Sequence, residues 1–134
     1  TKHEFARLLE AGAASILQMN LGRVGGLLEA KKIASMAETR QAQIAPHLYC
    51  GPVVAAANIQ IATCSPNFLI LESIGRFEGP YMSVLKSSIQ WEDGYVIPST
   101  EPGLGVELND EMIASNPYSG SDLHLDMTLE PVVP

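Results

Sequence analysis

Hydrophobic and polar positions follow two different rhythms along the first 72 residues of the chain. Three longer stretches, residues 2–11, 27–40 and 53–63, are either apolar at helical spacing or apolar on nearly all sides, which predicts three helices. Three short and mostly apolar runs, residues 16–20, 43–46 and 68–71, are typical of strands buried on both faces. Because helices and strands alternate, the pattern predicts parallel βα units and an α/β fold.

Capping and turn residues mark the ends of these elements. Thr1 is an N-cap candidate with Glu4 three residues later, the spacing of a capping box, and Gly12 is expected to end that helix. Pro52 fits the first turn of the third helix. A tight connection is expected at Gly22 and at the glycine pair 25–26. The second helix is expected to turn the following side chains toward the core: Leu27, Leu28, Ile33, Met36 and Ala37.

The pattern changes after residue 88. Residues 89–97 form two β-prone arms around Asp93-Gly94, which predicts a hairpin, and residues 98–105 are rich in turn formers. A short helix is expected over 109–114 with Asn109 or Asp110 as its cap, followed by an extended tail over 115–134. We therefore divide the chain into a βα part, residues 1–88, and a hairpin-and-tail part, residues 89–134.

A polar residue stands at the end of each predicted strand: Asn20, His47 and Glu72. The carboxyl ends of parallel strands meet at one edge, where (β/α) barrels and open doubly wound sheets both build their active sites. The pattern therefore predicts that the three side chains gather at one site. It does not choose between the two folds.

These three residue types suggest acid–base chemistry. His47 can act as a general acid or base near neutral pH, although a structural or solvated histidine is the alternative. Glu72 is expected to pair with a cation or to keep a proton; otherwise it bonds the neighbouring backbone or Arg76. Asn20 can orient an imidazole but cannot stabilise an imidazolium as aspartate does, and it could equally be a turn residue.

Composition excludes several other functions. The formal charge is −7 with no basic block, so nucleic acid is not an expected partner, and no apolar run is long enough to span a membrane. The two cysteines, Cys50 and Cys64, lack metal-binding spacing and fit reduced thiols in the cytoplasm. Residues 22–26 match neither phosphate-binding fingerprint, and no motif supports Cys50 as a nucleophile beside His47.

Several stretches together resemble the mandelate racemase branch of the enolase superfamily, and most closely its galactonate-dehydratase-like sugar-acid dehydratases. The resemblance runs from about Thr1 to Leu108 in the family's order. It is carried by residues 17–26 (LQMNLGRVGG), 29–34 (EAKKIA), 45–52 (APHLYCGP), 66–72 (PNFLILE), 93–98 (DGYVIP) and 102–108 (PGLGVEL).

The resemblance implies a modified (β/α) TIM-type barrel of which residues 1–88 would form strands six to eight. The hairpin and tail would pack toward a capping domain that is absent from this chain. Mg²⁺ would be the cofactor, held by three carboxylates from strands three to five, so its ligands are expected upstream of Thr1 and none in this chain. It would stabilise an enediolate formed by proton removal next to a carboxylate, before the 3-hydroxyl leaves as water.

The resemblance also implies roles for the strand-end residues. His47 matches the seventh-strand histidine that serves as acid or base. Glu72 matches the eighth-strand glutamate that donates a hydrogen bond to the substrate carboxylate. Asn20 stands where the family has the aspartate that pairs with the histidine, and this departure should weaken the basicity of His47.

The predicted function is a segment of a Mg²⁺-dependent acid-sugar dehydratase, acting on a small acid-sugar or 2-hydroxy acid in the cytoplasm. A racemase or epimerase of the same superfamily is one alternative. A non-catalytic or inactive member is the other, because Asn20 replaces the aspartate and the metal ligands are missing. The complete enzyme is expected to be a homo-oligomer. The isolated 134 residues are expected to be inactive and, with open strand edges, unstable as a monomer.

Overall fold

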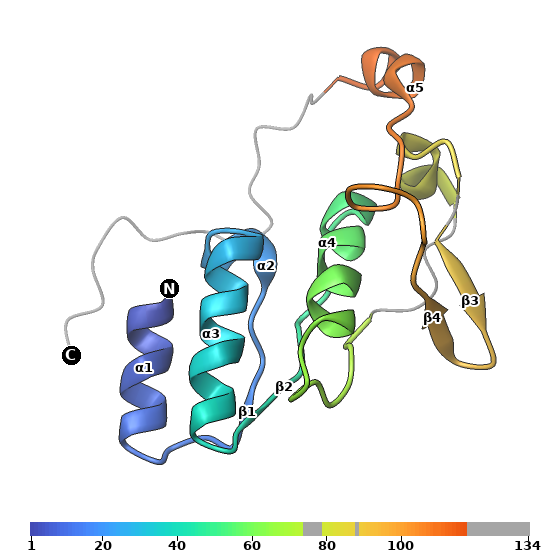
Figure 1. Ribbon diagram of the computed structural model, residues 1–134. Coiled ribbons are helices and arrows are strands. Elements are labelled where there is room, and N and C mark those ends of the chain that lie inside the picture. Colours follow the sequence, from blue (N-terminus) through green and yellow to red (C-terminus); the bar gives the residue numbers. More distant parts are fainter. Residues whose placement is uncertain (74–78, 88, 118–134) are drawn as a thin grey trace.

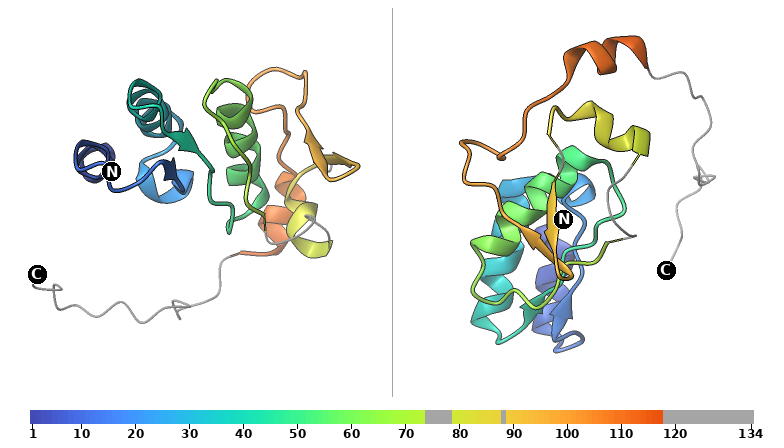
Figure 2. Two further views of the ribbon diagram at one scale, coloured as in Figure 1. Left: turned by 90° about the horizontal axis from the view of Figure 1, so that it is seen from below. Right: turned by 90° about the vertical axis from the view of Figure 1, so that its right-hand side faces the viewer.

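The computed structural model describes residues 1–73, 79–87 and 89–117, without the side chains of 79–81. Three helices, α1 (Lys2–Glu10), α3 (Leu27–Thr39) and α4 (Pro52–Thr63), lie side by side (Figure 1). Two short strands, β1 (Ile16–Leu17) and β2 (Gln43–Ile44), run along one side of α3 (Figure 2). The alternating pattern of the sequence is thus confirmed as an α/β arrangement.

The strands are parallel neighbours. Ile16 pairs with Gln43 and Leu17 with Ile44, and a further parallel bridge joins Ile44 to Phe68. The predicted third strand is therefore present as a single bridge next to β2. Leu17 and Ile44 are buried, but Ile16 is 48% exposed, so the expectation of burial on both faces is wrong for β1. About half of the Ile16 side chain is thus open to solvent on that outward face of β1.

The core lies between α3 and the strands. The buried side chains of α3 are Ala30, Ile33, Ala34 and Ala37. They form one stripe with the spacing i, i+3, i+4, i+7 that packs a helix face. Leu28 lies outside this stripe and is 69% exposed, so its predicted core position is wrong, and Leu27 is exposed as well. The small alanines lie in the core cluster where α3 packs against β2.

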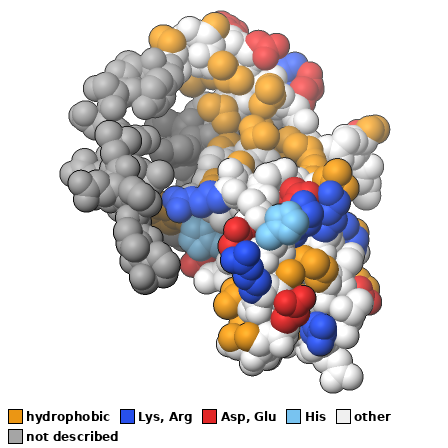
Figure 3. All heavy atoms as spheres, turned by 90° about the vertical axis from the view of Figure 1, so that its left-hand side faces the viewer, with side chains coloured by type: hydrophobic (Ala, Val, Ile, Leu, Met, Phe, Trp, Pro, Cys, Tyr) orange, Lys and Arg blue, Asp and Glu red, His pale blue; other side chains and the backbone are white. Residues whose placement is uncertain are grey.

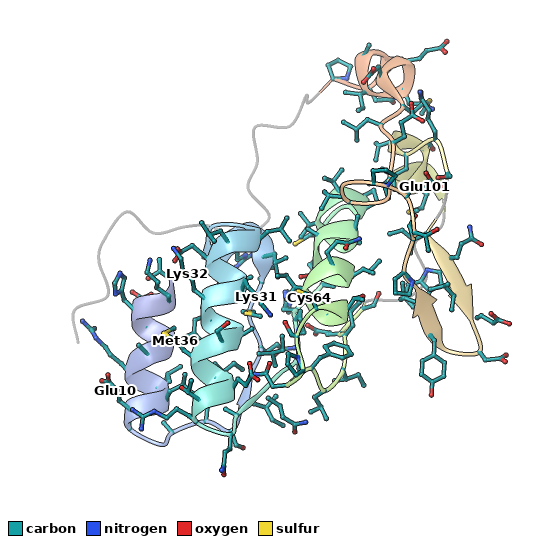
Figure 4. All side chains as sticks on the ribbon, viewed as in Figure 1. Glu10, Lys31, Lys32, Met36, Cys64 and Glu101 are labelled. Carbon is teal, nitrogen blue, oxygen red and sulfur yellow. The ribbon has the colours of Figure 1, made fainter. Side chains whose placement is uncertain are left out.

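The connections differ from the prediction in one respect. A short helix, α2 (Leu21–Val24), occupies the stretch expected to be only a tight turn. Gly25 and Gly26 then have φ values of 109° and 87°, a left-handed region that disfavours any Cβ, and they redirect the chain into α3. Lys31 Nζ of α3 donates to the carbonyl of Cys64 after α4 at 2.8 Å, which ties the two helices together (Figure 4).

The C-terminal part follows the predicted order. A 3₁₀ helix, η1 (Gly79–Val84), precedes the antiparallel hairpin of β3 (Gln90–Glu92) and β4 (Tyr95–Ile97). The hairpin turns at Asp93 and Gly94, both with positive φ, as the sequence predicted. Helix α5 (Asp110–Ser115) is capped by Asn109, whose side chain accepts from the Met112 N–H. The expected tail beyond residue 117 lies outside the described residues, and the division at residue 88 stays a prediction.

Charged side chains are interspersed on the face that carries α1 and α3 (Figure 3). Glu29 there contacts both Lys2 and Lys32, at 2.8 and 2.7 Å. Such mixed charge is typical of a solvated surface. None of the helices in the described part of the chain is long and apolar enough to cross a membrane.

Candidate active site

The three strand-end residues predicted from the sequence come together. Backbone pairing continues past the assigned strands: the His47 N–H donates to the Met19 carbonyl at 2.8 Å, and the Glu72 N–H to the Pro46 carbonyl at 3.2 Å. This register places Asn20, His47 and Glu72 on neighbouring strands at the same carboxyl edge. The gathering of polar residues at one edge is therefore observed.

Asn20 and His47 form a side-chain pair. Asn20 Nδ2 lies 2.8 Å from His47 Nδ1. The Asn20 backbone is fixed as the N-cap of α2, where its carbonyl accepts from the N–H groups of Arg23 and Val24 at 3.0 and 2.9 Å. The His47 carbonyl accepts from the fully buried Asn58 of α4 at 3.3 Å. Both partners are thus held from the backbone, and the imidazole orientation is set by Asn20.

Glu72 faces the other ring nitrogen. Its Oε2 lies 3.5 Å from His47 Nε2 and accepts from Gln18 Nε2 at 2.8 Å. The His47 and Glu72 side chains are 34% and 41% exposed, so a small molecule can reach both. The imidazole and the carboxyl therefore face one open space and can transfer or share protons with a bound molecule. Arg76, the alternative partner of Glu72, lies outside the described residues.

Sequence reasoning missed Gln18 and gave Cys50 no role. Gln18 stands two residues before Asn20, so in an extended backbone both side chains point to the same face. The two-residue repeat of a strand could therefore have predicted Gln18 at this site. The Cys50 thiol lies against Asn20, with Sγ 3.3 Å from Nδ2 and 3.6 Å from Oδ1. Nothing in the sequence indicated that contact, because the two residues are 30 positions apart.

Metal ligands do not gather at this site. Within residues 1–73, 79–87 and 89–117, no three His, Cys, Asp or Glu side chains are placed to hold an ion. The site contains one carboxylate, Glu72, with two amides, an imidazole and a thiol around it. Mg²⁺ prefers several oxygen ligands, so these residues do not by themselves fit a Mg²⁺ centre.

An apolar groove lies apart from these residues. It has a volume of about 660 Å³ and runs between α4, the segment 68–71 and the hairpin, with Phe68, Leu69 and Trp91 in its lining. Leu69 and Ile70 are exposed along this edge. None of Asn20, His47 and Glu72 lines the groove, so the candidate site is the polar edge.

Sequence comparison gives the family. The Enolase C-terminal domain-like family matches residues 1–112. A D-galactonate dehydratase from Cronobacter sakazakii is 36% identical over 128 residues, which cover 91% of this chain and 34% of that relative. A D-galactonate dehydratase from Ralstonia nicotianae gives the same identity and the same shares. The chain thus spans about a third of the length of the curated relatives it matches.

Solved structures agree. A protein from Labrenzia alexandrii, provisionally named a mandelate racemase/muconate lactonizing enzyme, is 68% identical with a TM-score of 0.88, over 100% of this chain and 34% of that one. An enolase from Agrobacterium radiobacter, provisionally named a galactarate dehydratase and bound to Na and L-malate, is 28% identical with a TM-score of 0.78, over 88% and 33%. By its sequence and its fold, the chain belongs to the mandelate racemase/muconate lactonizing type of the enolase superfamily, as part of its C-terminal domain.

Proposed function

We propose that the chain forms strands six to eight of the barrel of an acid-sugar dehydratase. The observation that carries the proposal is the placement of His47 Nε2 and Glu72 Oε2, 3.5 Å apart at the carboxyl ends of neighbouring parallel elements. The names of the D-galactonate dehydratases support an acid-sugar substrate, and the L-malate bound by the Agrobacterium protein is a hydroxy acid of similar chemistry.

Each side chain has a role in that reaction. Dehydration breaks the C2–H bond next to the carboxylate and the C3–O bond, and the resulting enol becomes a 2-keto-3-deoxy acid. His47 gives the Nε2 proton to the departing 3-hydroxyl, which leaves as water. Glu72 donates a hydrogen bond to the substrate carboxylate as negative charge builds on it. The base that removes the C2 proton is supplied by another part of the complete protein.

Gln18 and Asn20 position the two reacting groups. Gln18 donates to Oε2 of Glu72, and among the described residues no hydrogen bond or ion pair is formed by Oε1, which is left to meet the substrate. Asn20 holds the imidazole by Nδ1, so Nε2 points to the open space. Mg²⁺ would be held by carboxylates from another part of the complete protein, because within the described residues no three His, Cys, Asp or Glu side chains are placed to hold an ion. When bound, it would supply charge stabilisation at the substrate carboxylate.

The test uses the complete gene product with Mg²⁺ and a panel of acid sugars and 2-hydroxy acids. The reaction is followed in two ways, by the appearance of a 2-keto-3-deoxy acid and by NMR detection of an epimer. Formation of the keto acid supports the proposal. An epimer without loss of water would show a racemase or epimerase. If no acid sugar is turned over, the protein would instead be a non-catalytic or inactive member of the family.

A Glu72→Gln variant examines the carboxyl directly. Glutamine keeps the size of the side chain and a hydrogen-bond donor, but it cannot carry charge or move a proton. If Glu72 only donates a hydrogen bond, the variant retains much of the kcat. If it moves a proton, kcat falls by roughly 10²-fold or more.

A further inference from the structure

The Asn20 amide has a complete set of partners in its observed orientation. One Nδ2 hydrogen points to His47 Nδ1 at 2.8 Å and the other to Cys50 Sγ at 3.3 Å. The Cys50 S–H in turn donates to Oδ1 at 3.6 Å. Asn20 is only 8% exposed, so water is a poor substitute for any of these contacts.

This orientation decides which ring nitrogen carries the proton. Because Nδ2 is a donor, His47 Nδ1 must accept, and an accepting nitrogen has no hydrogen. The neutral imidazole therefore carries its hydrogen on Nε2, the nitrogen that faces Glu72 and the open space. In that state Nε2 is a hydrogen-bond donor toward the open space and cannot take a proton.

The opposite amide orientation satisfies fewer groups. With Oδ1 toward His47, the oxygen would accept from an Nδ1 hydrogen, and Nδ2 would still reach the thiol with one of its two hydrogens. Its second hydrogen would have no partner within the described part of the chain. The observed orientation thus leaves no amide group unpaired, and the reversed orientation leaves one.

We propose that Cys50 is a positioning residue that holds the Asn20 amide so that neutral His47 keeps its proton on Nε2. The thiol is needed because it both accepts from Nδ2 and donates to Oδ1. The consequence for catalysis, that neutral His47 cannot serve as the base through Nε2, rests on the proposed function. The tautomer itself does not depend on which reaction the protein performs.

Counting partners gives the expected size of the effect. One unpaired group in a buried amide corresponds to about one hydrogen bond, so the Nε2–H form should exceed the Nδ1–H form by roughly tenfold. In Cys50→Ala, each amide orientation leaves two groups unpaired, so the contribution of Asn20 to the excess is lost and only Glu72 Oε2, 3.5 Å from Nε2, still favours the Nε2–H form. In Cys50→Ser, the hydroxyl keeps both a donor and an acceptor, so the excess should be largely retained.

The tautomers are measured by ¹⁵N NMR of histidine-labelled complete gene product, at a pH where the ring is neutral. A His47→Gln variant assigns the signals, since protonated and unprotonated ring nitrogens differ widely in chemical shift. We expect an Nε2–H excess in the native protein and in Cys50→Ser, and a clearly smaller excess in Cys50→Ala. An Nδ1–H excess in the native protein, or an unchanged excess in Cys50→Ala, would overturn the proposal.

Kinetics provide a second reading. A smaller Nε2–H excess lowers the fraction of neutral rings that present Nε2–H to the substrate, so Cys50→Ala should lower kcat, by up to about twofold, with KM unchanged. Cys50→Ser should restore kcat, which a general loss of packing would not allow. If the NMR result holds but no acid sugar is dehydrated, the proposed function fails and the tautomer assignment stands. If dehydration occurs with an Nδ1–H ring, the tautomer assignment alone fails.

Discussion

Replacement of Ile33 by alanine tests whether the α3 stripe holds the strands that carry the site. Ile33 is fully buried among residues that include Leu17 of β1 and Ile44 of β2. Its truncation removes three carbons, worth about 2.4 kcal/mol at roughly 0.8 kcal/mol each. Incomplete collapse of the cavity increases the loss in free energy of unfolding by about 1 kcal/mol. The better helix propensity of alanine offsets about 0.4 kcal/mol of that loss. The expected loss is about 3 kcal/mol.

The assay is urea unfolding of the complete gene product followed by circular dichroism, analysed by linear extrapolation. Leu28→Ala is the matched control, since it lies on the same helix, removes the same number of carbons and is largely exposed. Its expected cost is below about 0.5 kcal/mol. A loss at Ile33 below about 1 kcal/mol, or equal to the loss at Leu28, would refute the assignment of α3's buried face.

Three further predictions concern other parts of the chain. Gly25→Ala should cost about 1–2 kcal/mol because φ is 109° there, whereas Gly51→Ala, at φ −66° with open space around it, should be nearly neutral; equal costs would contradict this. The hydrogen bond from Lys2, and next in size that from Lys32, lower the pKa of Glu29 from 4.5 to about 2. The interactions of Glu29 with these lysines therefore stabilise the fold above pH 4.5, and this stabilisation is lost as the pH falls toward 2. The stability difference between native and Glu29→Gln protein should shrink over that window, and a constant difference would argue against the ion pairs. Finally, the 134 residues alone should not melt as a concentration-independent two-state monomer, because apolar strand edges are exposed; calorimetry at several concentrations decides this.

The helices and the hairpin were predictable because their signals are local. Pro52 starts α4 as expected, and Asn109 caps α5 as one of two candidates. The hairpin followed from Asp93-Gly94, where both residues need positive φ. Leu28 shows the limit, since an apolar residue at a helix start can point away from the core. The buried face of α3 is the stripe through Ile33. Packing against the strands determines this face, and the sequence alone does not show it.

The site was predictable in outline and not in its contacts. Strand-end position was enough to bring Asn20, His47 and Glu72 to one edge, because parallel strands share their carboxyl ends. The roles of Gln18 and Cys50 depend on which way side chains point from strand and loop. Cys50 in particular reaches Asn20 across a loop that follows β2, a contact set by tertiary packing and invisible to spacing.

The most direct test of the central claim is kcat/KM of the complete gene product on the acid sugar it dehydrates, for the native protein and for His47→Gln. His3→Gln is the matched control, since His3 is an exposed histidine on α1. We predict that His47→Gln lowers kcat/KM by roughly 10²- to 10⁴-fold, the range for loss of a general acid, while His3→Gln leaves it unchanged. Native-like kcat/KM in a correctly folded His47→Gln protein would contradict the assignment of this edge as the catalytic site.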